Sequence, residues 1–369
     1  MRLSVCIAVI VCMLMGCTAE PEQAGSMGLR IDQLLGEDDN RGFALAEVPR
    51  PFVFPADHGP HPQYRSEWWY ITSTLQTDSG REFGVHYTLF RQALAPVTET
   101  QASTNWHTPQ AYLAHLAVSD VNTRTHRSAQ RFSRAHPALA GVQTVPTFAA
   151  VIEDWALTGQ QPGLLDWHLS ASQPHEFAVD LRFEQQSVVV PQGDNGLSAK
   201  GPGNASYYYS IPRLRTSGVL KLNGESHQVS GWSWLDREWS TSVLGEGVSG
   251  WAWFALQFDS GDSMMAFTLH REDGQRDPFD HGMVLQEQSV RKLTAADYQL
   301  IPEAFWTGPY GGRWPVAWRL QLTDGTTYHI KAAFDDQLMD GAVRYWEGVV
   351  DIFQYESRVG RGYMELTGY

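Results

Sequence analysis

The chain has 369 residues, with 41 acidic and 27 basic side chains and a formal net charge of −14 at pH 7. This negative excess argues against nucleic acid or anionic lipid headgroups as partners. Charged residues make up 18% and aromatic residues 12%, which indicates a well-packed globular body. About 320 residues follow the N-terminal segments, and that length predicts two domains.

The N-terminus has the pattern of a bacterial lipoprotein signal. Arg2 gives a positive start, and residues 3–15 form an apolar stretch too short for a transmembrane helix. Leu14-Met15-Gly16-Cys17 resembles a lipobox, which predicts cleavage directly before Cys17 and lipidation of that cysteine. We therefore assign residues 1–17 to the signal peptide with its lipidated cysteine. An ordinary secretory signal is the alternative.

The residues after the predicted anchor indicate where the protein is held. Thr18 follows the cysteine, and no aspartate there signals retention at the inner membrane. We expect an outer-membrane lipoprotein facing the periplasm, with inner-membrane anchoring or secretion as alternatives. Residues 18–47 are polar and acidic, as in a flexible tether. Cys6 and Cys12 lie in the signal, so the mature chain cannot form an internal disulfide.

The body is predicted to be β almost throughout. Residues 67–75 are aromatic and β-branched, 77–80 read as a turn and 82–90 alternate again, so the three segments predict a hairpin. A short helix is possible near 295–298. Many short strands separated by turns indicate a sandwich or antiparallel barrel. Further strands are predicted at 111–118, 149–156, 165–170, 177–183, 218–222, 227–235, 251–258, 263–270, 282–286, 316–322, 328–333 and 362–366.

A weak internal echo supports two similar halves. An aromatic pair, an Asp-Ser-Gly turn and an arginine follow one another twice, which favours a duplicated β-barrel unit. We expect the first domain to span 48–240 and the second 241–369. The first copy is Trp69-Tyr70, Asp78-Ser-Gly80 and Arg91, and the second is Trp253-Phe254, Asp259-Ser-Gly261 and Arg271.

Several common catalytic and cofactor motifs are missing from the sequence. There is no Gly-x-Ser-x-Gly elbow, phosphate-binding glycine-rich loop, His-Glu-x-x-His pair or Cys-x-x-Cys. The closest histidine pair, His58-Gly-Pro-His61, lies in a proline-rich loop without a partnered carboxylate motif. We therefore expect neither a metal nor a cofactor.

The strongest candidate site is Gly231-Trp-Ser-Trp-Leu-Asp-Arg-Glu-Trp239, which continues to Gly250-Trp-Ala-Trp-Phe254. Five tryptophans around an Asp-Arg-Glu triplet predict an apolar pocket holding a few ionisable groups. Desolvation would raise the pKa of Asp236, making it a proton donor whose cationic product the tryptophan faces could stabilise. Pairing with Arg237 would instead keep Asp236 ionised. Strand alternation places these neighbours on opposite faces and favours the acid.

Other ionisable residues lie inside aromatic strands. Glu67 precedes Trp68-Trp69, His86 lies opposite an apolar face, and His115 lies in an apolar run. Each could line a cavity. The commoner role for such a histidine is structural, with a hydrogen bond to a cross-strand neighbour.

Five separated motifs resemble the AttH family, which is related to the carotenoid 1,2-hydratases and often labelled "predicted secreted hydrolase". The resemblance runs from about residue 50 to the C-terminus. It implies two lipocalin-like (calycin) antiparallel β-barrels packed together, with a ligand near their interface. The motifs are Ser66-Glu-Trp-Trp-Tyr-Ile71, Phe83-Gly-Val-His-Tyr-Thr-Leu-Phe-Arg91, His115-Leu-Ala-Val-Ser-Asp120, the 231–239 segment and Gly362-Tyr-Met-Glu-Leu-Thr-Gly-Tyr369.

The resemblance also implies site residues. The acid of the hydratases corresponds to Asp236, and Trp234 stands where they carry a tyrosine. Their His-x-Trp pair corresponds to Tyr207-Tyr-Tyr209, so the histidine is replaced. We expect Asp236, Trp234, Tyr207 and Tyr209 to be catalytic. The expected ligand-binding residues are Glu67, Trp69, His86, His115, Trp232, Glu238, Trp239 and Trp253.

Two functions remain open. In the first, the protein is a cofactor-free hydratase or hydrolase acting on a lipophilic, isoprenoid or polyene-like molecule, with Asp236 as general acid and Tyr207, Tyr209 or Glu238 positioning water. In the second, it is a carrier that binds a lipophilic ligand without catalysis. Proteins resembling this one often lie beside ABC-type export permeases, which makes such a permease a possible partner.

Overall fold

The computed structural model describes residues 40–96, 108–161, 165–241, 244–245 and 247–369. The predicted signal peptide, Cys17 and most of the predicted tether lie outside these residues. Ala44 already belongs to the folded body, since its amide donates to the Gln63 carbonyl at 2.9 Å and its carbonyl accepts from Thr241. Ala46 is buried. Contact with the first domain therefore begins before residue 48, where the sequence placed the end of the tether.

The described chain folds into two antiparallel sheets, and its one helical element is a 3-10 turn, η2 (Ala56–His58). The predicted all-β class is confirmed. The strands of the first sheet are β1 (Ser66–Gln76), β2 (Glu82–Ala93), β3 (Gln110–Asp120), β4 (Thr125–Arg134), β5 (Ala140–Gln143), β6 (Ala149–Ile152), β7 (Trp155–Gly159), β8 (Asp166–Gln173), β9 (Phe177–Gln185), β10 (Val190–Pro191), β11 (Leu197–Gly201), β12 (Asn204–Leu222) and β13 (Glu225–Ser240).

The second sheet begins after the first has ended. It starts at β14, and this division of the chain follows the two halves of the internal echo. Its strands are β14 (Val248–Phe258), β15 (Ser263–Arg271), β16 (His281–Gln286), β17 (Ser289–Thr294), β18 (Tyr298–Thr307), β19 (Arg313–Leu322), β20 (Thr327–Ala332), β21 (Leu338–Asp340), β22 (Arg344–Gln354) and β23 (Ser357–Leu366).

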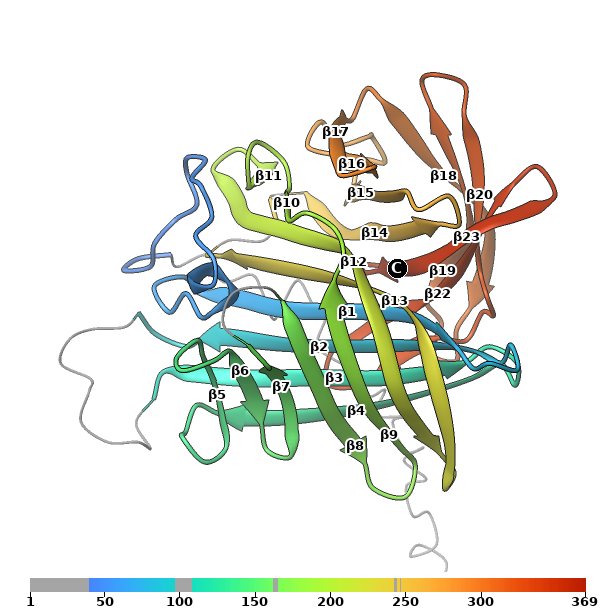
Figure 1. The fold of residues 1–369 in the computed structure, drawn as a ribbon. Coiled ribbons are helices and arrows are strands. Elements are labelled where there is room, and N and C mark those ends of the chain that lie inside the picture. The colour runs from blue at the N-terminus through green and yellow to red at the C-terminus, as the bar shows by residue number, and fades with distance from the viewer. Residues whose placement is uncertain (1–39, 97–107, 162–164, 242–243, 246) are drawn as a thin grey trace, which may run out of the picture.

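Both sheets curl in the same way. The first long strand of each pairs with the last, β1 with β13 and β14 with β23, and the strands left at the edges of each sheet are neighbours in sequence, β4 with β5 and β17 with β18. Each sheet therefore bends around its own core as a nearly closed barrel (Figure 1). The predicted pair of barrels is confirmed.

Strand alternation divides each barrel wall into an inner and an outer face. Along β1 and β13 the inner positions include Trp69, Leu235 and Trp239, which belong to the core of the first barrel. The positions between them face outward and pack on the second barrel. Trp253 from β14 joins Trp234 from β13 in that separate apolar cluster.

The two barrels meet through the outer faces of their longest strands. β1, β2 and β12 of the first sheet lie against β14, β15, β22 and β23 of the second (Figure 1), and Trp234 of β13 meets Trp253 of β14 edge to face. Gly84 in β2 permits the close approach, because a Cβ there would lie 2.1 Å from Val349 Cγ2 and 2.5 Å from Tyr363 Oη. His115 Nδ1 and Tyr345 Oη share a hydrogen bond of 2.7 Å across the same interface.

Most of the predicted strands lie within observed ones, with three differences. The segment predicted as one strand at 149–156 forms β6 and β7, because Glu153 has a φ of 51° and turns the chain. Residues 295–297 form a turn that leads into β18, so the short helix predicted at 295–298 is wrong. β13 continues past the predicted end at 235, which puts the whole Asp-Arg-Glu triplet inside a strand.

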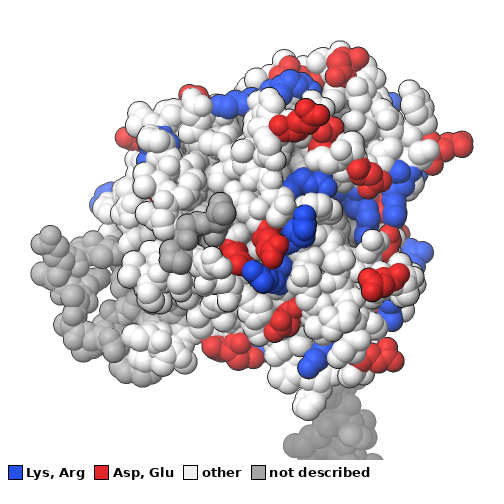
Figure 2. All heavy atoms as spheres, in the orientation of Figure 1, with Lys and Arg blue, Asp and Glu red and all other residues white. Residues whose placement is uncertain are grey.

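The surface carries both signs of charge. On the face in Figure 2, acidic and basic side chains alternate, with wide uncharged areas between them. Within the described ranges, no helix has the length and hydropathy needed to cross a bilayer.

Candidate functional site

A pocket with apolar walls lies between the two barrels. Its cavity volume is about 60 Å³. Seven of its fourteen lining residues are aromatic, and four are ionisable carboxyls or a lysine. The lining residues are Trp68, Tyr70, Phe90, Ser198, Lys200, Tyr208, Asp236, Glu238, Leu244, Trp251, Trp253, Phe267, His281 and Glu365.

Strand β13 delivers two carboxyl groups to this pocket. Asp236 and Glu238 share its outer face with Trp234, whereas Arg237 and Trp239 point into the first barrel. Alternation along the strand thus separates Asp236 from the arginine beside it in sequence. Arg237 Nη2 instead donates to Glu67 Oε2 at 3.0 Å, so the predicted acid has no cationic partner on its own strand.

Asp236 is held by three neutral donors. Tyr208 Oη donates to Oδ2 at 2.7 Å, while Ser210 Oγ and Trp234 Nε1 donate to Oδ1 at 2.5 and 2.8 Å. Burial raises the pKa of Asp236 to about 7, outweighing these hydrogen bonds, which lower it; the charge of Glu238 raises it further. The group therefore exchanges a proton near neutral pH, as a general acid must.

The second barrel supplies a facing pair of carboxyls. Glu347 in β22 and Glu365 in β23 lie directly opposite each other in the antiparallel register. Tyr70 Oη donates to Glu347 Oε1 at 2.7 Å, and Trp251 Nε1 donates to Glu365 Oε1 at 2.8 Å. Burial, and next the charge of Glu365, raise the pKa of Glu347 well above its usual range. Burial raises the pKa of Glu365 to about 7.

Glu238, the third carboxyl that lines the pocket, is already paired with a cation. Glu238 forms a buried ion pair with Lys200 and also accepts a hydrogen bond from Ser206. The Lys200 ammonium lies 5.2 Å from the ring centroid of Phe267, which adds a cation–π contact. Nearby, burial lowers the pKa of His281 to about 4, so this imidazole is neutral at pH 7.

The aromatic wall connects the two barrels. Trp253 Nε1 donates to Tyr208 Oη at 3.1 Å, and Tyr208 in turn donates to Asp236. The Tyr70 and Trp253 rings meet edge to face with centroids 5.2 Å apart. Residues of both chain halves therefore fix the position of the acid.

The predicted tyrosines require a correction. Tyr207 and Tyr209 point into the first barrel, where Tyr207 Oη donates to the Val48 carbonyl at 2.9 Å and Tyr209 Oη lies 2.6 Å from His58 Nδ1. Neither contacts Asp236. The residue between them, Tyr208, does so, because alternate residues of β12 face opposite sides of the sheet.

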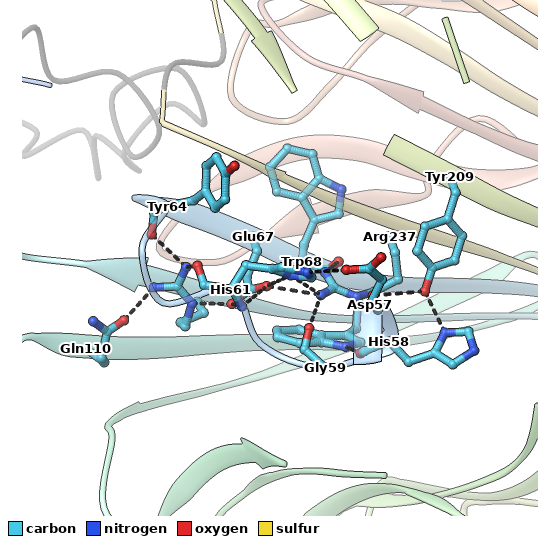
Figure 3. A network of polar contacts seen from close by, with 12 residues as sticks. Asp57, His58, Gly59, His61, Tyr64, Glu67, Trp68, Gln110, Tyr209 and Arg237 are labelled. Atoms are coloured by element: carbon cyan, nitrogen blue, oxygen red, sulfur yellow. Dashed lines mark hydrogen bonds and ion pairs between the residues drawn. The ribbon is translucent and has the colours of Figure 1, made fainter. Parts of the chain in front are cut away.

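Three further predicted ligand residues lie away from the pocket, inside the first barrel, and Figure 3 shows the polar network around one of them, Glu67. Glu67 is fully buried between Arg237 and Arg91. The Arg237 guanidinium lies 3.9 Å from the ring centroid of Trp69, and Trp239 stacks on His61 with centroids 3.8 Å apart. These contacts make Glu67, Trp69 and Trp239 structural, since their side chains point into the barrel and not between the barrels.

His86, His115 and Trp232 occupy the outer face of the first barrel without lining the pocket. His86 Nε2 shares a hydrogen bond of 2.6 Å with Thr88 Oγ1, and burial lowers its pKa well below the usual range. Burial lowers the pKa of His115 to about 4, and this residue bonds Tyr345. The Arg213 guanidinium lies over Trp232, 4.4 Å from the centroid of the indole ring. Of the predicted ligand residues, Glu238 and Trp253 line the pocket.

The sequence reasoning missed Tyr208, Ser210, Glu347 and Glu365. Tyr208 and Ser210 could have been found by counting alternate positions along β12, because both lie on the outer face. Glu365 belongs to the quoted C-terminal motif, yet only the packing of the barrels brings it to the pocket. Among the described residues, no group of three or more His, Cys, Asp or Glu side chains is arranged to hold a metal ion.

Comparison with known proteins identifies the relatives of this two-barrel arrangement. The profile of the AttH-like family matches residues 45–369. The chain belongs to the AttH-like family. A crystal structure of an AttH protein from Nitrosomonas europaea is 31% identical, with a TM-score of 0.78 over 89% of this chain and 100% of that one. No curated protein matches.

A more distant structure shares the fold. Kievitone hydratase from Nectria haematococca is 14% identical, with a TM-score of 0.63 over 89% of this AttH-like chain and 98% of its own. At this identity the likeness concerns the architecture, so two packed lipocalin-like barrels also form the scaffold of a hydratase.

Proposed function

We propose that this AttH-like protein is a cofactor-free hydratase that adds water to a carbon–carbon double bond of a lipophilic molecule in the pocket between the barrels. The observation that carries the proposal is the state of Asp236, a carboxyl buried among aromatic walls without a cationic partner. Burial raises its pKa to about 7. A carboxylic acid kept protonated near neutral pH can protonate a weak base such as an alkene.

The proposed reaction uses one carboxyl from each barrel. Asp236 gives its proton to one alkene carbon, and positive charge develops on the other carbon beside the aromatic faces of Trp251 and Trp253. A water molecule donates an electron pair to that carbon, and Glu365 accepts the proton that the water loses. The product is an alcohol, and proton exchange with solvent returns Asp236 and Glu365 to their starting states.

The size of the pocket limits what part of a substrate reacts. The cavity between the barrels has a volume of about 60 Å³. A whole polyene is far larger than this cavity, whereas the terminal double bond of such a chain is its smallest reacting part. We therefore propose that the end of an isoprenoid-like chain enters the pocket. Lipid anchoring through Cys17 on the periplasmic side, which we also propose, would place this site near membrane-borne substrates.

The proposal is tested by incubating the full mature chain with kievitone and, separately, an acyclic carotenoid in ¹⁸O-labelled water. A product heavier by one labelled water, formed by the wild type and lost in Asp236→Asn, supports it. Asp280→Asn is the matched control, because Asp280 is a buried carboxyl of the second barrel bonded to Thr268 and Leu269 outside the pocket. Retention of either compound without conversion would favour the carrier function.

A further inference from the structure

The pocket already holds one positive charge in a recognisable way. The Lys200 ammonium forms an ion pair with Glu238 while lying 5.2 and 5.9 Å from the centroids of Phe267 and Tyr208. An acidic oxygen beside aromatic faces is an arrangement that binds organic ammonium ions. Here the chain supplies the cation itself.

The same chemistry recurs on the opposite wall without a cation. Glu365 lines the pocket, and the indole of Trp251 is fixed beside it by its hydrogen bond of 2.8 Å. Glu347 is fully buried behind Glu365, and its Oε2 has no hydrogen-bond donor. Two carboxyls on neighbouring strands therefore share a site that no arginine or lysine among the described lining residues neutralises, since Lys200 is paired with Glu238.

We propose that the interdomain pocket binds a lipophilic organic cation, a quaternary or protonated tertiary amine, with its head group against Trp251 and Trp253 and its charge facing the Glu347–Glu365 pair. The inference deepens the proposed function, because such a head group resembles the alkene end after protonation.

Charge balance makes this binding proton-coupled. Glu347 and Glu365 lie opposite each other on paired strands, so one shared proton relieves the repulsion between their charges, and a bound ammonium ion can supply the counter-charge in its place. The groups facing the pair set the range of pH. They are Asp236 and Glu238 with Lys200 from the first barrel, the hydroxyls of Tyr70, Tyr208 and Tyr345, and the neutral His281.

A neutral isostere separates charge from shape. Choline and 3,3-dimethylbutan-1-ol differ in a nitrogen–carbon exchange that removes the positive charge, and hexyltrimethylammonium adds the lipophilic chain. Isothermal titration of the full mature chain with all three at pH 8 should give tighter binding of choline than of the alcohol by at least tenfold, and tighter still for hexyltrimethylammonium. Affinity for both cations should fall as pH drops below about 7, while that for the alcohol stays constant.

Variants locate the charge. Glu365→Gln should weaken hexyltrimethylammonium at least tenfold and flatten its pH dependence, and Trp251→Phe should weaken it less. Asp280→Asn should bind as the wild type does. Equal affinities for choline and the alcohol, or an unchanged affinity in a folded Glu365→Gln protein, would overturn the inference. Absence of labelled product with intact ammonium binding would instead overturn the proposed hydration.

Discussion

Arg237 and Glu67 form an ion pair inside the first barrel, with Nη2 and Oε2 3.0 Å apart. Both side chains are fully buried. The pair fixes the chemistry on the other side of the sheet, because an arginine committed to the barrel interior cannot neutralise the adjacent Asp236. The same strand thus carries a structural charge on one face and a candidate acid on the other.

Glu67→Gln should destabilise the protein by about 3–5 kcal/mol, because it leaves the buried guanidinium groups of Arg237 and Arg91 without their common counter-charge. Urea denaturation followed by tryptophan fluorescence measures the loss. Arg182→Ala, which removes an exposed ion pair with Asp166, serves as a control that should remain close to the wild type. A Glu67→Gln protein as stable as that control would show that the network does not hold the barrel.

Tyr208→Phe should change the pH profile of activity, whereas Tyr209→Phe, one residue along the strand, should change only the stability. Loss of the Tyr208 hydrogen bond removes a donor that stabilises ionised Asp236, so the pKa of Asp236 rises and the alkaline limb of any Asp236-dependent activity moves to higher pH. Loss of the Tyr209–His58 bond should cost about 1 kcal/mol of stability and leave the pH profile in place. pH–rate profiles of both variants, with thermal melts, provide the comparison. Matching profiles would separate Tyr208 from the acid.

Local patterns predicted the position of Asp236 but not the residues around it. Aromatic crowding and period-two alternation along 231–239 were sufficient to place Asp236 in an apolar pocket opposite Arg237. The same alternation applied to 207–209 would have selected Tyr208. Matching by family order put Tyr207 and Tyr209 there instead. Alternation fixes which residues share a face of the strand. It does not tell which of the two faces packs into the barrel core and which faces the second barrel.

The missing half of the site depends on packing between sheets. Glu365, with Glu347 opposite it on the paired strand, comes near Asp236 only because β22 and β23 lie against the first barrel, a relationship between segments more than a hundred residues apart. No spacing in the sequence encodes it. β22 was also missed as a strand, whereas the hairpin of β1 and β2 was predicted because its turn signal and both alternating runs are contiguous.

Removing the Asp236 carboxyl should change how stability depends on pH. The folded pKa of about 7 exceeds the ordinary value of 3.8, so between these values the folded chain holds a proton that the unfolded chain has lost. The contribution of Asp236 to the free energy of unfolding is therefore greatest at low pH and falls as pH rises through this window, by up to about 1.4 kcal/mol per pH unit. Relative to the wild type, Asp236→Asn should gain stability from pH 5 to pH 8.

Urea titrations of both proteins at pH 5, 6.5 and 8 give that difference, and the shared histidines cancel in it. Asp57→Asn provides a control whose difference from the wild type should stay constant over this range. Burial raises the pKa of Asp57, but hydrogen bonds from His61 and Arg50 lower it more, so its stabilisation is lost only at acid pH. A constant difference between the wild type and Asp236→Asn from pH 5 to 8 would mean that Asp236 is not protonated in the folded chain.

Gly84→Ala should weaken the contact between the barrels without altering either core. Its Cβ would overlap Val349 Cγ2 at 2.1 Å and Tyr363 Oη at 2.5 Å, both from the second barrel, so the facing strands must separate. Overpacking of this kind costs about 1–3 kcal/mol. Gly141→Ala is the matched control, since nothing lies within 4 Å of its added Cβ and its φ is not positive. Differential scanning calorimetry should show a lower melting temperature for Gly84→Ala alone. The same variant should lose affinity for hexyltrimethylammonium, because the pocket is built from both walls; an unchanged affinity together with a lowered melting temperature would place the site within one barrel.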